Sequence, residues 1–271
     1  MRLAVLTAGL AMALAAQEAA PPPALEYTGQ PLRIPFQCTL DDIQWGGLTC
    51  SDEDPCPVYL ELTAVESVGN KIFAAGNIHS ASATLYSILL ASDDSGRTWR
   101  EPFERLRGCG LDHIQFVDFE NGWASGQVLQ PLPQDPFFLV TGDGGKTWRR
   151  RPVFGESRPG SILQFWFSSR ANGSLIIDRG QGGDVARYEL FETPNGGETW
   201  MLRETNEKPM RLKRAAANDD WRIRADAPTR SFRVERKQAE RWSPLAAFSI
   251  ALAGCKPPPP PPAEPPAPPQ P

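Results

Sequence analysis

The chain has 271 residues, 41% of them hydrophobic, and a formal net charge of −4. This length is enough for one sizeable core, and single all-β domains of this size are common. A weakly acidic chain without a concentrated basic face gives no reason to expect a nucleic-acid partner.

The first residues predict export. Met1-Arg2 is followed by an apolar run from Leu3 to Ala15 that ends in Ala-Leu-Ala. A basic start, an apolar core and a small-residue exit are typical of a secretory signal peptide, so we expect cleavage after residues 1–16 and a periplasmic or extracellular protein. An uncleaved anchor is the alternative. The run is shorter than the about 20 residues that span a bilayer, so we expect no integral membrane segment after cleavage. Residues 17–31, rich in Ala and Pro, predict a leader.

A short stretch recurs three times and fits Ser/Thr-x-Asp/Asn-x-Gly-x-Thr-Trp each time. Its fixed residues are Ser92, Asp94, Gly96, Thr98 and Trp99, then Thr141, Asp143, Gly145, Thr147 and Trp148, then Thr193, Asn195, Gly197, Thr199 and Trp200. Asp or Asn accepts hydrogen bonds from turn N–H groups, and Gly adopts the positive φ that such a turn needs. We therefore expect each copy to form the tip of a β-hairpin, with its carboxylate serving the turn and its tryptophan packed beside it.

The three copies resemble the Asp-box, or BNR, repeats of sialidases and of many non-enzymatic β-propellers. The segment Ile114 to Gly126 also resembles the blade opening of propellers similar to the photosystem II assembly factor. The resemblance covers about residues 58–250 and implies an all-β fold, a β-propeller of four or five four-stranded blades. It identifies a repeat unit better than an activity, because function lies in sites grafted onto folds.

Aligning the boxes divides a propeller spanning residues 32–255 into repeat units. The expected units are about 58–104, 105–154, 155–205 and 206–250. Each has three short strands before the box and one after it, as radial sheets require. The fourth keeps Trp242 at the box position but neither Asp nor Gly.

The ends of the chain must serve ring closure, because an open sheet edge is a liability. Residues 32–57 are expected either to complete the last sheet or to build a partial blade. Residues 256–271 are nearly all proline and cannot enter a sheet. They predict an extended polyproline II spacer or a disordered tail.

Five cysteines make an odd set, and export permits disulfides. We expect Cys38 to pair with Cys255 across both ends of the ring and Cys50 to pair with Cys56 around a small loop. Cys109 then remains a free thiol. A metal site is the alternative, but the sequence has neither a C-x-x-C pair nor a histidine cluster, so we expect no metal and no cofactor.

Catalytic signals are sparse. No nucleophile elbow, phosphate loop or His-Glu-x-x-His helix occurs, and we assign no catalytic residue. Leu32-Arg33-Ile34-Pro35 nevertheless resembles the Phe/Tyr-Arg-Ile-Pro motif of sialidases, in which the arginine would help to clamp a substrate carboxylate. Tyr188 and Glu189 offer the letters of that family's nucleophile pair, but neighbours in a strand point to opposite faces. A sialidase-like glycoside hydrolase is therefore the alternative to a binding, assembly or scaffold module.

In propellers, hairpins that carry Asp boxes lie opposite the usual ligand face. The ligand-face loops are then expected at 77–84, 127–136 and 178–186, with interblade loops at 104–112 and 154–161. Their polar groups give the binding candidates Asn77, His79, Asp135, Arg158 and Arg179. The expected partner is an unidentified protein or glycan.

Overall fold

The computed structural model describes residues 24–129, 132–180, 187–212, 220–251 and 254–256. The predicted signal peptide, most of the leader and the proline-rich tail beyond Lys256 lie outside the described residues. The described chain is almost wholly β-structure, with one short helix, α1 (Leu40–Trp45). No helix in this part of the chain is long and apolar enough to cross a membrane.

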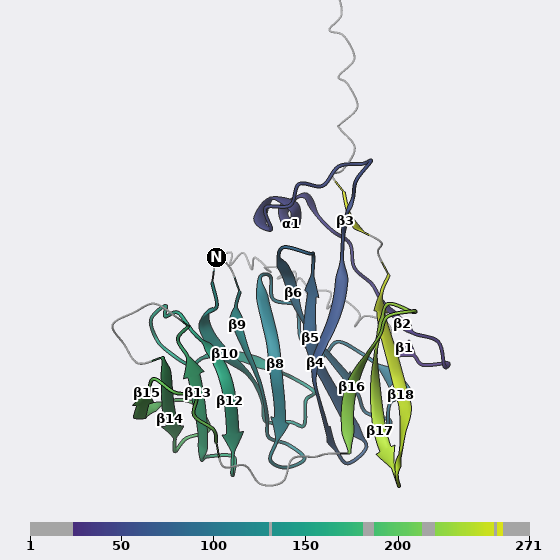
Figure 1. The fold of residues 1–271 in the computed structure, drawn as a ribbon. Helices are drawn as coiled ribbons and strands as arrows, with labels where there is room; N and C mark the ends of the chain where they lie inside the picture. Colours follow the sequence, from purple (N-terminus) through teal and green to yellow (C-terminus); the bar gives the residue numbers. More distant parts are fainter. Residues whose placement is uncertain (1–23, 130–131, 181–186, 213–219, 252–253, 257–271) are drawn as a thin grey trace, which may run out of the picture.

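Four sheets follow the order of the predicted repeats (Figure 1). Sheet I contains β4 (Tyr59–Val68), β5 (Lys71–His79) and β6 (Thr84–Ser92), and Arg100, directly after β7 (Thr98–Trp99), is bridged to Ala91 of β6. Sheet II contains β8 (Cys109–Phe116), β9 (Gly122–Val128), β10 (Gln134–Thr141) and β11 (Arg149–Pro152). Sheet III contains β12 (Ser161–Phe167), β13 (Gly173–Asp178), β14 (Tyr188–Thr193) and β15 (Met201–Asn206). Sheet IV contains β16 (Trp221–Asp226), β17 (Ser231–Gln238), β18 (Arg241–Ile250) and β2 (Leu32–Ile34). The described chain also has two short antiparallel strand pairs. Strand β1 (Leu25–Glu26) pairs with β7, and β3 (Cys56–Pro57) pairs with β19 (Gly254–Cys255).

The four sheets pack face to face in the order IV, I, II, III. Buried apolar side chains fill each of the three interfaces. In β10, Phe137 and Leu139 pack into the cluster shared with sheet I, whereas Phe138 and Val140 pack into the cluster shared with sheet III. Successive side chains of a strand point to opposite faces, so this unbroken apolar run serves two interfaces. A third cluster joins sheet I to sheet IV.

The ring closure expected from the repeats is not seen in the described residues. No apolar cluster there joins sheet III to sheet IV, and the two sheets stand at opposite ends of the row (Figure 1). The free face of sheet III receives the chain's own continuation, where Leu212 N–H donates to Gln164 Oε1 (3.1 Å). The free face of sheet IV carries paired charges, such as Arg222 with Glu235 (2.6 Å), which disfavour packing against an apolar neighbour.

The three Asp boxes share one pattern of hydrogen bonds. In the first, the Ser92 hydroxyl accepts from Gly96 N–H (2.8 Å) and donates to Asp94 Oδ1 (2.9 Å). Asp94 also accepts from the N–H (2.9 Å) and the hydroxyl (2.7 Å) of Thr98. The second box repeats these contacts with Thr141, Gly145, Asp143 and Thr147. The third uses Thr193, Gly197, Asn195 and Thr199, and there the Asn195 amide donates to the Thr199 hydroxyl (3.0 Å).

The box tryptophans pack against the preceding sheet. Trp99 of sheet I meets Phe248 of sheet IV edge-on at 4.9 Å between ring centroids, and its Nε1–H donates to Gly96 O (2.9 Å). Trp148 lies 6.0 Å from Phe73 of sheet I, and Trp200 lies 5.8 Å from Phe138 of sheet II. The tryptophans therefore fill joints between sheets as well as covering their own hairpins.

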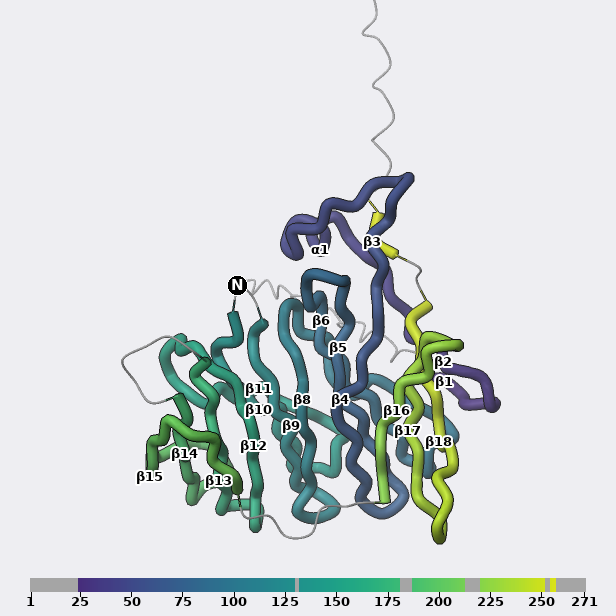
Figure 2. The backbone as a smooth tube through the Cα atoms, in the orientation of Figure 1, coloured from purple at the N-terminus to yellow at the C-terminus, as the bar shows by residue number. Residues whose placement is uncertain are grey.

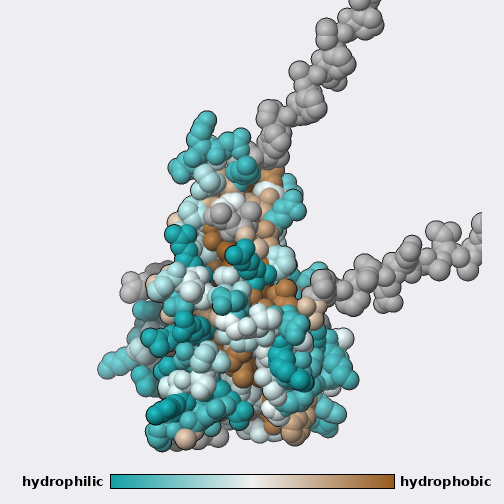
Figure 3. Space-filling model, turned by 90° about the vertical axis from the view of Figure 1, so that its right-hand side faces the viewer, coloured by the Kyte–Doolittle hydropathy of each residue, from teal (hydrophilic) through white to brown (hydrophobic). Residues whose placement is uncertain are grey.

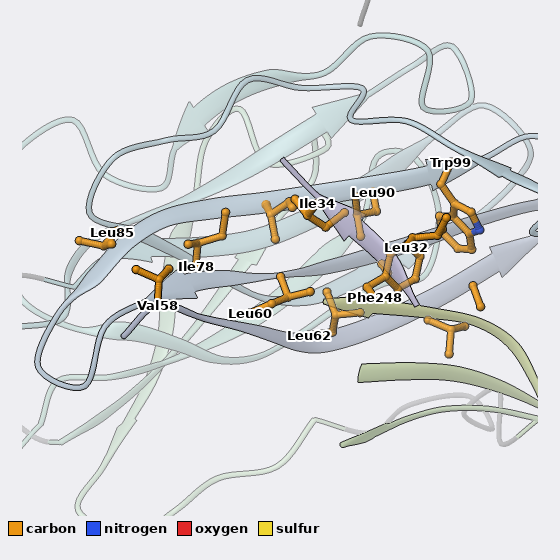
Figure 4. Packing of buried hydrophobic residues seen from close by; sticks show 14 of the residues in the cluster. Leu32, Ile34, Val58, Leu60, Leu62, Ile78, Leu85, Leu90, Trp99 and Phe248 are labelled. Atoms are coloured by element: carbon orange, nitrogen blue, oxygen red, sulfur yellow. The ribbon is translucent and has the colours of Figure 1, made fainter. Parts of the chain in front are cut away.

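The N-terminal segment completes the last sheet, which decides between the two alternatives left open by the sequence. Strand β2 pairs in parallel with β18, Leu32 opposite Phe248 and Ile34 opposite Ile250. Leu32 and Ile34 are buried beside Trp99, as Figure 4 shows, while Arg33 between them is exposed. Figure 2 shows this purple segment alongside the yellow C-terminal strands. Strands from the N-terminal and C-terminal parts of the described chain thus lie in one sheet.

Residues 35–57 form a cap over one end of sheet I. Thr39 caps helix α1 in a capping box with Asp42. The buried Asp42 carboxylate accepts from the Tyr86 hydroxyl (2.6 Å) and pairs with Arg107 (3.2 Å), which fixes the helix to sheet I and the connection that follows it. Disulfides join Cys38 to Cys255 and Cys50 to Cys56, and Cys109 is a buried free thiol.

The boxes predict an acid-sensitive component of stability. Burial raises the pKa of Asp94 and Asp143, but hydrogen bonds from Thr98 and Thr147 outweigh it and lower each pKa from 3.8 to about 2. The contribution of each carboxylate is therefore fully present above about pH 4 and is lost as the pH falls towards 2. Urea unfolding of the parent should show this fall in unfolding free energy. An Asp94→Asn/Asp143→Asn variant should flatten it, because the third box already works with Asn195. Identical slopes for both proteins would contradict this account.

The two disulfides should contribute unequally. They close separations of 217 and 6 residues, so in the chain-entropy model the outer bond is worth about 5 kcal/mol and the inner one about 2 kcal/mol. Cys38→Ser/Cys255→Ser should therefore lower the unfolding free energy by more than Cys50→Ser/Cys56→Ser, measured in urea under non-reducing conditions. The inner-pair variant serves as the matched control, and equal losses would show that the outer bond does not constrain the ends of the fold.

Candidate functional site

The sheets have two ends, one carrying the Asp boxes and one, here called the apical end, carrying the cap and the β5–β6 and β9–β10 hairpins (Figure 1). The five binding candidates do not converge there on one point. Asn77 and His79 belong to sheet I, whereas Asp135, Arg158 and Arg179 meet where sheets II and III adjoin.

Asn77 is buried and holds two sheets together. Its Oδ1 accepts from the Leu111 N–H of β8 (2.9 Å), and only 6% of the residue is exposed. A buried side chain committed to a backbone donor is not open to a ligand. His79 lies at the surface, where its Nδ1–H donates to Ser80 O (2.9 Å) and its ring lies 5.6 Å from that of Tyr59.

Asp135, Arg158 and Arg179 form a connected group. Asp135 Oδ1 accepts from Arg158 N–H (2.9 Å), and Asp135 N–H donates to Arg158 O (2.9 Å). Arg179 pairs with the buried Glu189 (2.9 Å) and donates to Pro159 O (2.6 Å). Both guanidinium groups lie over the Phe154 ring, at 4.8 Å and 5.6 Å. The Asp135 carboxylate and the Arg179 guanidinium thus have polar partners within the group, whereas the Arg158 guanidinium has only the Phe154 ring among the described residues.

The residues that resemble sialidase site residues, Arg33, Tyr188 and Glu189, do not lie together in the structure. Tyr188 and Glu189 are both buried in β14, with exposures of 5% and 6%, and Glu189 is held by Arg179. Arg33 lies in sheet IV, at the opposite end of the row of sheets (Figure 1). A substrate clamped at Arg33 would therefore not reach this tyrosine–carboxylate pair.

A cleft of about 800 Å³ opens at the apical end between sheets I and IV. Its walls come from β2 (Arg33), the start of β4 (Tyr59 and Leu60), the β16–β17 hairpin (226–231) and the end of β18. Figure 3 shows this side of the molecule, where apolar surface runs below the cap between polar flanks. The cleft exists because sheet IV packs on sheet I through Phe248 and Trp99 and leaves the apical ends of both sheets apart.

Two arginines line this cleft without a partner. Within the described residues, neither the Arg33 nor the Arg230 side chain makes a hydrogen bond or an ion pair, and both residues are exposed. Arg230 also adopts a φ of +47°, a left-handed conformation that costs an ordinary residue on the order of 1 kcal/mol.

Among the described residues that line the cleft, the one carboxylate, Asp226, already has partners. Asp226 accepts from the Thr229 hydroxyl (2.5 Å) and from Arg233 (2.5 Å). The hydrogen bond from Thr229 lowers the pKa of Asp226, more than solvent exclusion raises it, and Arg233 adds to the lowering. Asp226 therefore shapes the hairpin and leaves both free guanidinium groups to a ligand.

The arrangement suits recognition of a carboxylate or another planar anion next to an apolar group. Guanidinium forks bind carboxylates in two-point geometry. Tyr59, of which 42% is exposed, offers an aromatic surface beside His79. Of these residues the sequence pointed to Arg33, through its motif, and to His79. Tyr59 and Arg230 carry no local signal, because their importance depends on sheet IV lying beside sheet I.

No protein-family model matches the chain, and no curated protein matches it. Among solved structures, it is similar to "YCF48 bound to D1 peptide", at 18% identity over 70% of this chain and 56% of that one, with a TM-score of 0.41. YCF48 from Cyanidioschyzon merolae gives 19% identity, 70% and 57% coverage and a TM-score of 0.37. The GH74 xyloglucanase from Xanthomonas campestris gives 15% identity, 68% and 29% coverage and a TM-score of 0.34. The chain spans little more than half of the YCF48 chains, 56% and 57%.

Proposed function

We propose that this chain is an exported binding module, of the assembly or scaffold kind, that holds a carboxylate-bearing segment of its partner in the apical cleft. The observation that carries the proposal is the pair of unpartnered guanidinium groups, Arg33 and Arg230, in a cleft of about 800 Å³. Nine arginines of the described chain are ion-paired, whereas Arg33 and Arg230 are not and both line this one cavity.

The surroundings favour binding over chemistry. Tyr59 and Phe232 supply apolar and aromatic surface, and Arg33 and Arg230 supply charge of one sign. The available carboxylate, Asp226, is held by Thr229 and Arg233 and is not free to act as an acid or a base. Two positive groups beside an apolar wall fix the orientation of a ligand that carries one anionic end.

Export supports the same reading. The two disulfides fit an oxidising compartment, as the predicted signal peptide does. The Cys38–Cys255 bond joins the cap to β19, and β19 pairs with β3, so the wall of the cleft formed by Pro57 and Tyr59 is braced before any ligand arrives. A braced site loses little conformational entropy on binding.

Anisotropy measurements with a fluorescein-labelled tetrapeptide, Gly-Ala-Leu-Ala, test the proposal. The peptide with a free carboxylate should bind more tightly than its C-terminal amide. Arg230→Gly should weaken the binding of the acid by about tenfold, since a hydrogen bond to a charged group is worth about 1.5 kcal/mol. The same variant should be at least as stable as the parent, because glycine relieves the left-handed turn.

Ala239→Gly is the matched control, because Ala239 has a φ of +53° in the β17–β18 turn, away from the cleft. It should gain the same stability and leave binding unchanged. Equal affinity for acid and amide, or full affinity in Arg230→Gly, would contradict the proposal. Sialyllactose, added as a competitor, shows whether a glycan carboxylate is preferred. If the parent hydrolyses a fluorogenic sialoside and Arg33→Ala does not, the protein is an enzyme and the binding-module proposal is wrong.

A further inference from the structure

The last described strand passes the wall of the apical cleft and runs on towards the cap. Strand β19 pairs with β3, with Cys255 opposite Cys56 and Gly254 opposite Pro57. Pro57 lines the cleft, and Cys255 is also bonded to Cys38. Two constraints thus hold the last described strand at this place, and the described chain ends one residue later at Lys256, whose Nζ lies 3.9 Å from Asp52 Oδ1 in the cap.

The segment that follows has an unusual composition. Residues 257–271 read PPPPPPAEPPAPPQP, and Glu264 is the only charged side chain among them. Proline-rich segments favour polyproline II, which loses little conformational entropy on binding. Aromatic-lined grooves are the surfaces that recognise this conformation.

The cleft complements that composition. Tyr59, 42% exposed and set 5.6 Å from the His79 ring, gives prolines an aromatic surface. Arg33 and Arg230 have no partner in the described residues, and the only charge of the segment is negative. At about 3.1 Å per residue, Glu264 lies roughly 25 Å of chain beyond Lys256, which is ample to turn back across a neighbouring cavity.

We propose that residues 257–271 of this chain occupy the apical cleft as an internal ligand. Prolines lie on Tyr59 and His79, and the Glu264 carboxylate meets Arg33 or Arg230. The inference rests on the proposed function in one respect: a partner that uses the same arginines must displace the segment. Occupancy needs little intrinsic affinity, since a short tether gives an effective concentration of about 1 mM, so a segment with a Kd of about 1 mM is bound half of the time.

Photo-cross-linking in the full chain tests the contact without any external ligand. With benzoylphenylalanine in place of Ala263, irradiation should give intramolecular cross-links that mass spectrometry maps to Tyr59, Phe232 and their neighbours in the cleft. Tyr59→Ala should reduce the yield at least fivefold. Phe119→Ala removes a more accessible aromatic, 69% exposed, from the Asp-box end and should leave the yield unchanged. Cross-links that map elsewhere, or only between molecules, would overturn the inference.

A second arm separates this inference from the proposed function. Replacing residues 257–271 by a Gly-Ser segment of equal length should raise affinity for the carboxylate tetrapeptide at least twofold, and Glu264→Gln should do so in part. Equal affinity in all three chains would refute the internal ligand and leave the binding module standing. Cross-links into the cleft, with no peptide binding by any chain, would uphold the internal ligand and refute the proposed function.

Discussion

Packing of one aromatic ring per repeat against the preceding sheet determines how this chain is assembled. Trp99 reaches Phe248 of sheet IV, Trp148 reaches Phe73 of sheet I, and Trp200 reaches Phe138 of sheet II. The box hydrogen bonds place each indole, and the indole joins two sheets. Trp242, at the same position in the fourth unit, has Arg222 over its ring at 4.2 Å instead of a neighbouring sheet. The three joints between sheets each contain a box tryptophan, and sheets III and IV, which no such tryptophan joins in the described chain, form the two ends of the row.

The proposed binding site is a consequence of the first of these joints. Trp99 and Phe248 hold sheet IV against sheet I, and β2 adds the strand that carries Arg33. The disulfide between Cys38 and Cys255 then fixes the cap and the last described strand, β19, above the same joint. The cleft forms between parts that come from both ends of the sequence, so its chemistry depends on the packing that brings those ends together.

The sequence was sufficient for local features and insufficient for this joint. Turn chemistry at Asp94, Asp143 and Asn195 predicts the hairpins, because side chain and backbone partners lie within four residues. The place of Arg33 in an edge strand follows from its alternation with the buried Leu32 and Ile34. Asn77 was expected at a ligand surface but lies between sheets I and II, and a closed ring was expected where the described chain shows an open row. Both outcomes depend on which faces meet, and strand periodicity is the same for a face that meets a neighbour and for one that meets solvent. Arg230 and Tyr59 escaped notice for the same reason.

A double-mutant cycle on Trp99 and Phe248 tests most directly whether an aromatic joint holds sheet IV on sheet I. The cycle compares urea unfolding of the parent, Trp99→Ala, Phe248→Ala and the double variant. Aromatic pairs contribute about 0.5–1.5 kcal/mol beyond the area they bury, so a coupling energy of about 1 kcal/mol is predicted. Losses that add within about 0.3 kcal/mol would show that the two rings do not interact, and the order of sheets described here would be contradicted.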